Sequence, residues 1–214
     1  MINVLITAGP TREKIDPIRY ISNNSSGKQG YAIAEYMSKI GWKVNLVSGP
    51  VEIKCDNIEN IIYINTAHEM LQTCIKLLPV DIAIFAAAVT DWCPVYSSIK
   101  IKKEKITNIQ VTPNPDIIYQ ISTHKKRPKL VIGFSLESEN IIENSQIKLL
   151  NKKCDWIIAN TLHINNKEVM GNDNNQITII TQDKHYEFPI MSKKEIARLI
   201  TEKIIDFLDN NLVN

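Results

Sequence analysis

Residues 3–31 read NVLITAGPTREKIDPIRYISNNSSGKQGY, and the rest of the chain is organised around this stretch. Residues 4–7 (VLIT) are apolar and largely β-branched, which favours a buried parallel strand. Residues 8–10 (AGP) break that strand, a long polar loop follows, and residues 25–30 (SSGKQG) lead into an amphipathic helix. Glycine lets a backbone approach an anion closely, and the unpaired N–H groups at a helix start point toward it. The stretch therefore predicts a phosphate site between a strand and a helix.

The spacing of this motif differs from that of the common phosphate loops. Residues 25–30 match G-x-G-x-x-G with serine at the first position, but about seventeen residues separate them from the strand. The next strand ends in Ser48-Gly49-Pro50 rather than in an acid. A Walker A loop does not fit, because Gln29 follows Gly27-Lys28. Spacing alone leaves two alternatives open, a phosphate site or a helix N-terminus capped by serine.

Composition bounds the class of protein. The chain has 214 residues, 44% of them hydrophobic, so we expect one globular domain over residues 1–214. A net charge of +2 gives no reason to expect nucleic-acid or membrane binding, and no apolar run approaches the roughly 20 residues of a membrane helix. The N-terminus shows no signal region, and the scattered cysteines form no C-x-x-C pair, which favours the cytoplasm. Neither cysteines nor histidines have metal-ligand spacing, so we expect no metal site built by the protein.

Apolar periodicity alternates between strand and helix along the chain. The expected strands cover residues 4–7, 43–47, 61–64, 81–89, 129–136 and 155–159, and the expected helices cover 27–40, 66–78, 138–153 and 192–210. Two of these helices begin at capping boxes, Thr66 to Glu69 and Ser192 to Glu195. The alternation predicts an α/β fold, a Rossmann-like doubly wound sheet whose strands are mostly parallel.

The middle and the end of the chain depart from that alternation. Residues 92–105 are rich in proline, serine and lysine, and we expect them to form a mobile flap. Residues 106–111 favour an extra strand, and residues 176–188 favour a hairpin. At Asn114-Pro115-Asp116 we expect a helix start, with asparagine as the cap and proline at the first position.

Residues 4–30, with GPTREKIDPIRYISNNSSGKQG at their centre, resemble the opening signature of phosphopantothenoylcysteine synthetase. Five further segments match this family in order: residues 86–92 (AAAVTDW), 100–103 (KIKK), 114–116 (NPD), Gly133-Phe134 with Glu137, and 155–160 (DWIIAN). Together they cover about residues 4–175. Thr90 departs from the family pattern, which has alanine before the aspartate, and we expect this change to tune the site rather than to abolish it.

Each segment also has a purely structural interpretation. A strand end of small residues is usually a place of close helix packing, and a lysine run is usually a solvated face. Asp91 can be an ordinary strand-end cap, and Trp92 and Phe134 are core residues by default. The order of the segments favours function instead, since several fall at the carboxyl ends of strands, where open α/β sheets bind ligands.

The resemblance implies a ligase on the route to coenzyme A. Its members attack the α-phosphate of CTP with the carboxylate of 4′-phosphopantothenate, which gives an acyl-cytidylate and pyrophosphate. The amine of L-cysteine then displaces CMP and forms the amide. Polyanionic reactants of this kind need lysines, backbone N–H groups and Mg²⁺ for positioning and charge stabilisation.

The resemblance also implies roles for single residues. Asn23 would hold the pantothenoyl portion, with Arg19, Ala87 and Ala88 also against the substrate. Asn23 and Lys100 are the candidate catalytic residues, Lys100 meeting charge that develops at the α-phosphate. The implied nucleotide-binding residues are Ser25, Gly27, Gly30, Phe85, Ala86, Asp91, Pro115, Asp116, Ile117, Ile118, Phe134, Lys148 and Lys152, with Lys28 as a weaker candidate. Helix spacing supports one pair independently, because Lys148 and Lys152 are four residues apart and share a face.

Two alternatives belong to other classes: an NAD(P)-binding oxidoreductase, suggested by the imperfect glycine motif, and a catalytically inactive nucleotide-binding module. The resemblance further implies a homodimer, with the extra strands near residues 106–111 and 176–188 at its interface. Since the chain starts directly at the synthetase strand, we expect the decarboxylase of the next step to be a separate protein. The bacterial-type layout favours CTP over ATP.

Overall fold

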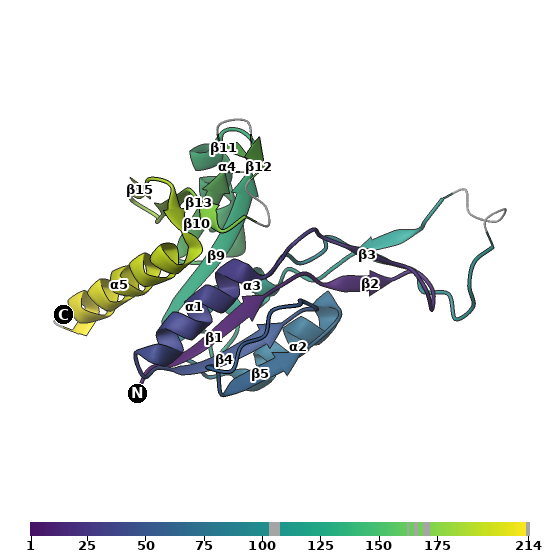
Figure 1. Cartoon of the computed structure of the whole chain (residues 1–214), viewed down its shortest axis with the longest axis horizontal. Helices are drawn as coiled ribbons and strands as arrows, with labels where there is room; N and C mark the ends of the chain where they lie inside the picture. The colour runs from purple at the N-terminus through teal and green to yellow at the C-terminus, as the bar shows by residue number, and fades with distance from the viewer. Residues whose placement is uncertain (103–107, 162, 165–166, 169–171, 213–214) are drawn as a thin grey trace.

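The computed structural model describes residues 1–102, 108–161, 163–164, 167–168 and 172–212. Its centre is an eight-stranded sheet (Figure 1). In spatial order the strands are β5 (Asn60–Tyr63), β4 (Lys43–Ser48), β1 (Asn3–Ala8), β6 (Ile82–Phe85), β9 (Leu130–Glu137), β10 (Trp156–Thr161), β14 (Ile177–Ile180) and β15 (His185–Glu187).

The strands from β5 to β10 are parallel to one another. Counted along the chain, their spatial order is 3-2-1-4-5-6, which is the order of the doubly wound dinucleotide-binding sheets. β14 runs antiparallel to β10 and forms a hairpin with β15. The predicted α/β fold and the predicted hairpin over residues 176–188 are confirmed.

Helices cover both faces of the sheet. α1 (Lys28–Lys39) and α5 (Lys193–Leu212) pack on one face, and α2 (Ala67–Leu77), α3 (Ile117–Ser122) and α4 (Ile141–Lys152) pack on the other (Figure 1). The side chains of β1 alternate between the two layers, since Val4 and Ile6 join the core under α1 while Leu5 joins the core under α2. This burial on both faces explains why the strands are continuous apolar runs.

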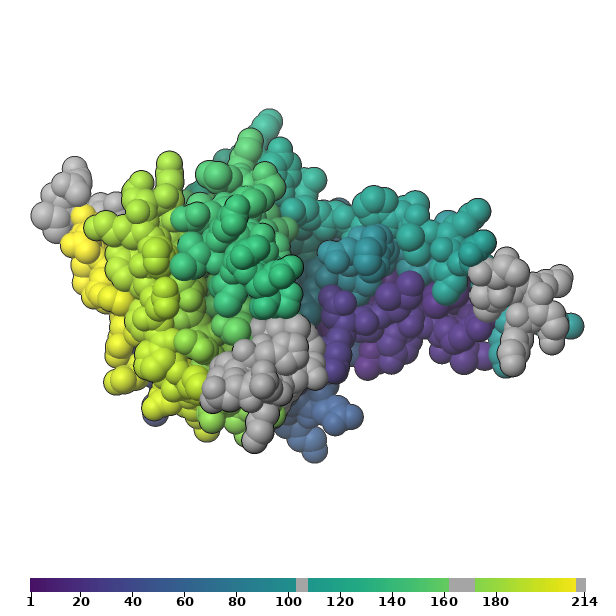
Figure 2. All heavy atoms as spheres, turned by 90° about the horizontal axis from the view of Figure 1, so that it is seen from above, coloured from purple at the N-terminus to yellow at the C-terminus, as the bar shows by residue number. Residues whose placement is uncertain are grey.

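Four strands of three residues each lie outside this sheet and build an extension that we call the arm, residues 11–22 with the described residues of 92–113. β2 (Arg12–Lys14) pairs with β3 (Tyr20–Ser22), and β7 (Trp92–Pro94) pairs with β8 (Val111–Pro113). Figures 1 and 2 show the arm projecting away from the helices and the sheet. Two smaller pairs are β11 (His163–Ile164) with β12 (Lys167–Glu168), and β13 (Asn174–Asn175) with β16 (Met191–Ser192).

The structure corrects three expectations about these elements. The polar loop expected after Pro10 contains the β2–β3 hairpin, whose three-residue strands are too short for a visible alternation. Of the strand expected over 106–111, residues 106 and 107 lie outside the described residues, residues 108–110 are not in a strand, and β8 begins only at Val111. β6 ends at Phe85 rather than at Val89, since residues 86–89 leave the regular ladder at the edge of the cavity described below.

A fourth correction concerns the start of α3, where the cap is Asp116 rather than Asn114. The Asp116 side chain accepts the N–H of Tyr119 at 3.1 Å. Asn114 donates its backbone N–H to Asp91 O at 2.8 Å and its side-chain amide to Thr90 O at 2.8 Å, so it is held at the end of the preceding segment. The predicted capping boxes are present, because Thr66 with Glu69 and Ser192 with Glu195 exchange the expected hydrogen bonds. None of the helices in the described ranges has the length and apolar character needed to cross a membrane.

Candidate functional site

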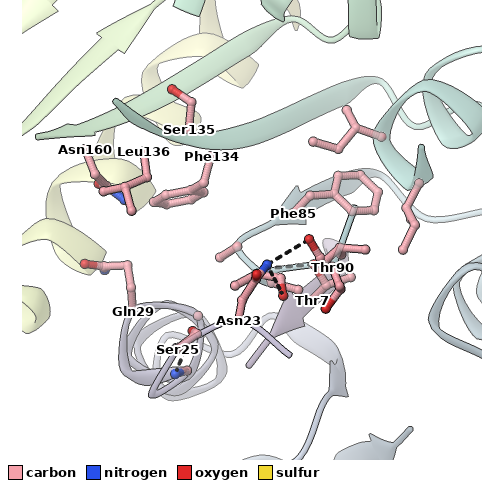
Figure 3. A pocket seen from close by; sticks show the side chains of 18 of the residues that line it. Thr7, Asn23, Ser25, Gln29, Phe85, Thr90, Phe134, Ser135, Leu136 and Asn160 are labelled. Carbon is pink, nitrogen blue, oxygen red and sulfur yellow. Dashed lines mark hydrogen bonds between the residues drawn. The ribbon is translucent and has the colours of Figure 1, made fainter. Parts of the chain in front are cut away.

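A cavity of about 790 Å³ opens at the carboxyl ends of β1, β6, β9 and β10, where the strand order of the sheet reverses (Figure 3). This volume lies in the range of cavities that hold a nucleotide-sized ligand. The cavity is lined by most of the residues predicted for the site: Asn23, Ser25, Gly27, Lys28, Gly30, Phe85, Ala86, Ala87, Ala88, Asp91, Pro115, Asp116, Ile117, Ile118, Phe134, Lys148 and Lys152.

The N-terminus of α1 forms one wall of the cavity. Its N-cap is Gly27, at φ +74°, which has no side chain to pair with the first N–H groups of the helix. Ser25 Oγ instead accepts the N–H of Gly27 at 3.3 Å, just before the helix begins. No serine side chain therefore caps α1, and the phosphate site stays a prediction. An uncapped helix N-terminus that faces a cavity favours a negatively charged ligand.

Gly30 explains how α1 comes so close to the end of β1. A Cβ atom at Gly30 would lie 2.6 Å from Ala8 Cβ and 3.2 Å from Thr7 O, distances that packed side chains do not adopt. Glycine at this position lets the first turn of α1 rest directly on the strand. The motif therefore serves close packing of helix and strand, and through it the position of the helix N-terminus at the cavity.

Asn23 and Thr90 fix the segment that follows β6. The Asn23 side-chain amide donates to Ala88 O at 3.2 Å and to Val89 O at 3.0 Å, as Figure 3 shows. Thr90 is buried, and its N–H donates to Thr11 Oγ1 at 3.0 Å while the two hydroxyl oxygens lie 3.2 Å apart. The departure from alanine at position 90 thus adds a hydroxyl that is hydrogen-bonded to the base of the arm.

The two lysines of α4 face the cavity, and each is paired with a carboxylate. Lys148 Nζ lies 2.6 Å from Glu137 Oε1, at the end of β9, and the Glu137 side chain is 11% exposed. Lys152 Nζ lies 2.9 Å from Asp116 Oδ2, beside the start of α3. The shared helix face predicted for these lysines is confirmed, since both line the cavity.

Apolar residues form the opposite wall. Phe134 is half-buried and projects from β9 into the cavity, on the side facing Asn23 and Ser25 (Figure 3). Phe85 and Ile117 also line the cavity, and each is 4% exposed. A half-buried aromatic ring at the wall of a cavity provides a flat surface on which a planar ring can stack.

Sequence reasoning missed several residues that line the cavity: Thr7, Gln29, Asn160, Asn175 and Lys193. Lys193 begins α5, and burial together with the nearby Lys28 lowers its pKa, while Asp173 opposes this shift. Asp173 Oδ1 also pairs with Lys28 Nζ at 2.7 Å. Packing of α5 on α1 brings these groups together, and no local pattern encodes that packing. Asn160 could have been found, because it lies near a strand's carboxyl end.

Two predicted residues lie outside the cavity of their own chain. Arg19 and Lys100 are on the arm, where Arg19 binds Asp16 and the Ile101 carbonyl oxygen, and Lys100 is exposed. Of the other flap lysines, Lys103 and Lys105 lie outside the described residues. Across the described ranges, no group of three or more His, Cys, Asp or Glu side chains is arranged to hold a metal ion.

The fold and the cavity define the class of protein first: a doubly wound α/β protein with a helix N-terminus and lysines at the switch point of its sheet. The family model for the DNA/pantothenate metabolism flavoprotein C-terminal domain matches residues 1–208, and the chain belongs to that family.

Relatives and solved structures agree with this assignment. The chain is 41% identical over 203 residues to the coenzyme A biosynthesis bifunctional protein CoaBC of Borreliella burgdorferi, covering 92% of this chain and 50% of that protein. The crystal structure of the C-terminal domain of CoaBC superposes with a TM-score of 0.82 at 35% identity, covering 98% of this chain and 96% of that domain. A Cab2 mutant in complex with phosphopantothenate-cysteine shares the fold, with a TM-score of 0.69, 15% identity and coverage of 98% and 88%. The chain spans about half the length of the curated relatives it matches.

Proposed function

We propose that residues 1–214 form one synthetase domain, a ligase that joins 4′-phosphopantothenate to L-cysteine. CTP activates the pantothenate carboxylate as an acyl-cytidylate with release of pyrophosphate, and the cysteine amine then displaces CMP. The observation that carries the proposal is the single cavity that brings together an uncapped helix N-terminus, Lys148, Lys152 and the Phe134 ring. The names of the relatives, which act in coenzyme A biosynthesis, and the Cab2 complex with phosphopantothenate-cysteine support it.

The cavity suggests how its walls would divide the reactants. The α1 N-terminus with Ser25, Gly27 and Gly30 would receive the triphosphate, because backbone N–H groups favour anions there. The base would lie against Phe134, and Lys148 and Lys152 would meet the remaining negative charge. Asn23 and the small residues Ala87 and Ala88 would hold the acyl substrate. Asp91 would bind the nucleotide sugar or order the site.

Mg²⁺ is expected with the nucleotide, and the carboxylates of the cavity are its candidate protein ligands. Asp116 is engaged by Lys152, whereas Asp91 forms no ion pair with any residue in the described ranges. Mg²⁺ commonly binds one or two carboxylates and completes its shell with phosphate oxygens and water. Asp91 therefore fits a second candidate role, in place of binding the sugar, as the protein ligand of a metal that is held mainly by the nucleotide. Such a metal would neutralise charge on the phosphates.

The position of Arg19 and Lys100 on the arm is one reason to propose a homodimer. The arm exposes Trp92 (56%), Tyr96 (54%) and Ile99 (74%), a set of large apolar side chains on a segment without a core of its own. A second subunit that covers this surface would also place Arg19 and Lys100 near a cavity. We propose that the arm and the β14–β15 hairpin contribute to this interface. Light scattering that shows only monomer at working concentration would contradict the proposal.

The experiment that tests the function is a pyrophosphate-release assay with 4′-phosphopantothenate, CTP and L-cysteine. We expect release that requires all three substrates and a clear preference for CTP over ATP. Turnover with ATP that equals or exceeds turnover with CTP would change the nucleotide and keep the ligase. No release with either nucleotide, together with tight binding of CTP, would support an inactive binding module.

Ligand-binding measurements on the same protein test the remaining alternative, an NAD(P)-binding oxidoreductase. Nicotinamide cofactor binding without CTP binding would establish an oxidoreductase. The dinucleotide folds place an acid at the end of the second strand to bind the ribose. Here that place is taken by Ser48, whose hydroxyl is hydrogen-bonded to the Tyr31 hydroxyl at 2.9 Å and to Gly49 O at 2.8 Å. The arrangement therefore favours the ligase over the oxidoreductase, and we propose that the ligase acts in the cytoplasm.

A further inference from the structure

A buried carboxylate organises the tip of the β2–β3 hairpin. Asp16 Oδ1 accepts the backbone N–H groups of Ile18 and Arg19, each at 2.9 Å, which closes the turn between the two strands. The Asp16 side chain is fully shielded from solvent, at 0% exposure. A carboxylate in such a place is stable only because its oxygens are satisfied by donors.

The second oxygen of the same carboxylate reaches across to the flap. Asp16 Oδ2 accepts from Arg19 Nε at 3.1 Å, from Arg19 Nη2 at 2.5 Å and from the backbone N–H of Ile101 at 3.2 Å. Arg19 Nη2 also donates to Ile101 O at 3.0 Å. Asp16 and Arg19 together thus bind both backbone polar groups of Ile101, and we call this arrangement the Asp16–Arg19 clamp.

The clamp acts next to Lys100. Ile101 follows Lys100 directly, and a second attachment lies just before it, where the Ser97 N–H donates to Ile15 O at 2.9 Å. The backbone on either side of Lys100 is therefore tied to the hairpin, while its own side chain stays exposed. A long side chain on a fixed backbone position reaches a defined region of space with little ordering cost.

We propose that Asp16 and Arg19 are positioning residues for the ligase reaction, which hold the backbone of the flap so that the Lys100 ammonium can meet the reacting phosphate. This inference rests on the proposed function. It gives Arg19 a role in addition to the substrate binding that the resemblance implies, because its Nε and Nη2 groups bind Asp16 and Ile101 while 39% of the side chain stays exposed. Arginine suits the role, since its planar fork can bind a carboxylate and a carbonyl at once, whereas lysine presents a point charge.

The clamp is charged under ordinary assay conditions. The Arg19 guanidinium and the N–H groups of Ile18, Arg19 and Ile101 hold the pKa of Asp16 well below its usual value, against the opposing effect of burial. Protonation therefore does not open the clamp near neutral pH, and a substitution is needed to test it.

Asp16→Asn is the sharpest variant, because it breaks one half of the network. The amide oxygen can keep the two bonds that Oδ1 accepts, so the turn can persist. The amide NH2 then faces Arg19 Nε, Arg19 Nη2 and the Ile101 N–H, which are all donors, and the link to the flap is lost. Arg19→Lys is the second variant, as it keeps the charge and removes the fork. Arg12→Lys is the matched control, because Arg12 lies on the same hairpin and packs on the Tyr20 ring, 4.8 Å from its centroid, but is not one of the two residues of the Asp16–Arg19 clamp.

Two measurements are made on each protein: cysteine-independent exchange of labelled pyrophosphate into CTP, and amide hydrogen exchange of residues 97–102. We expect Asp16→Asn and Arg19→Lys to lower kcat for pyrophosphate exchange by roughly tenfold to a hundredfold, with the KM for CTP little changed. Amide exchange of residues 97–102 should rise in both variants, and the Arg12→Lys control should match the wild type in both measurements. Unchanged amide exchange in Asp16→Asn would overturn the clamp.

A double-mutant cycle with Lys100→Gln tests whether the clamp acts through Lys100. If it does, adding Asp16→Asn to Lys100→Gln causes no further loss of rate. Rate losses that simply multiply in the double variant would overturn the positioning role. Wild-type protein that shows no pyrophosphate exchange at all would overturn the proposed function, a result distinct from that one.

Discussion

The central sheet and the arm use strands of very different length and burial. β9 has eight residues, and Leu130, Val131 and Ile132 within it are all at 0% exposure. The arm strands have three residues each, and large side chains such as Trp92 and Val95 are more than half exposed. The sheet is therefore stabilised by apolar burial on both faces, whereas the arm buries few apolar side chains, such as Ile15 at 8% exposure.

Polar side chains hold the arm instead. Glu13 on β2 is buried and accepts the N–H of Ala67 at 2.8 Å, so it binds the first turn of α2. Thr11 and Thr90 are hydrogen-bonded at the base of the arm, and the Asp16–Arg19 clamp closes its tip. The chain thus combines a core stabilised by apolar burial with an arm that is held by polar contacts and exposes apolar side chains. Four experiments test this difference between the sheet and the arm.

The largest effect is expected in the sheet. Leu130→Ala removes a fully buried side chain and leaves a cavity between the sheet and the layer of α1 and α5, which should cost roughly 2–5 kcal/mol of unfolding free energy. Ile99→Ala is the matched arm variant, and its side chain is 74% exposed, so it should change the stability by less than about 0.5 kcal/mol. Urea unfolding of both proteins measures the difference. Similar losses at the two positions would show that the arm contributes to the core.

The reverse pattern is expected for activity. Lys100→Gln should slow pyrophosphate exchange by about 10²–10³, or roughly 3–4 kcal/mol, because it removes a charge placed at the reacting phosphate. Its melting temperature should stay unchanged, since an exposed lysine contributes little to the fold. Exchange within about threefold of wild type would assign Lys100 to the solvated surface.

The junction between the two regions gives an intermediate effect. Thr90→Ala restores the residue usual in the family and removes the Thr90 hydroxyl, so the buried Thr11 hydroxyl loses its acceptor at 3.2 Å and keeps only the Thr90 N–H as its donor. We expect a loss of about 1 kcal/mol. For a chain of this size this lowers the melting temperature by about 2–4 °C. Activity should be retained. Thr112→Ala is the control, because Thr112 is exposed on the arm, and an equal loss there would remove the special role of the junction.

The smallest expected effect is a difference in the reactivity of the four cysteine thiols. Burial raises the pKa of Cys74 to about 12 and that of Cys154 to about 11, so both remain neutral thiols at pH 8 and are shielded from reagent. Cys93 on the arm and Cys55 also have raised pKa values but are partly exposed. In the native protein a thiol reagent should therefore label Cys93 and Cys55 first, faster as the pH rises, and label all four only in urea. Equal rates at the four thiols would contradict the contrast in packing.

These two regions also differ in how far the sequence predicts them. The apolar runs of β1, β4, β9 and β10 indicated the sheet, because burial on both faces leaves a continuous signal. The hairpin β2–β3 was expected to be a loop, since its order comes from Asp16, Glu13 and Thr11 rather than from periodicity.

The candidate site shows the same division. The family resemblance named most of the residues that line the cavity, and their position agrees with the rule that ligands bind at the carboxyl ends of parallel strands. Arg19 and Lys100 came from resemblance alone, and the structure puts them on the arm rather than in the cavity of their own chain. Lys193 was missed because only the packing of α5 on α1 brings it to the cavity.

The pairing of Lys148 with Glu137 and of Lys152 with Asp116 has a consequence for turnover. A nucleotide bound as proposed cannot gain the full attraction of two bare cations, because each ammonium must first share or leave a carboxylate. When the nucleotide binds, each lysine ammonium exchanges its carboxylate for a phosphate. The carboxylates stay nearby and can pair with the ammonium groups again when the nucleotide leaves. Such an exchange weakens the hold on the spent nucleotide after the amide has formed. The two carboxylates would thus favour release of the spent nucleotide. A cavity with unpaired lysines would hold that nucleotide more tightly.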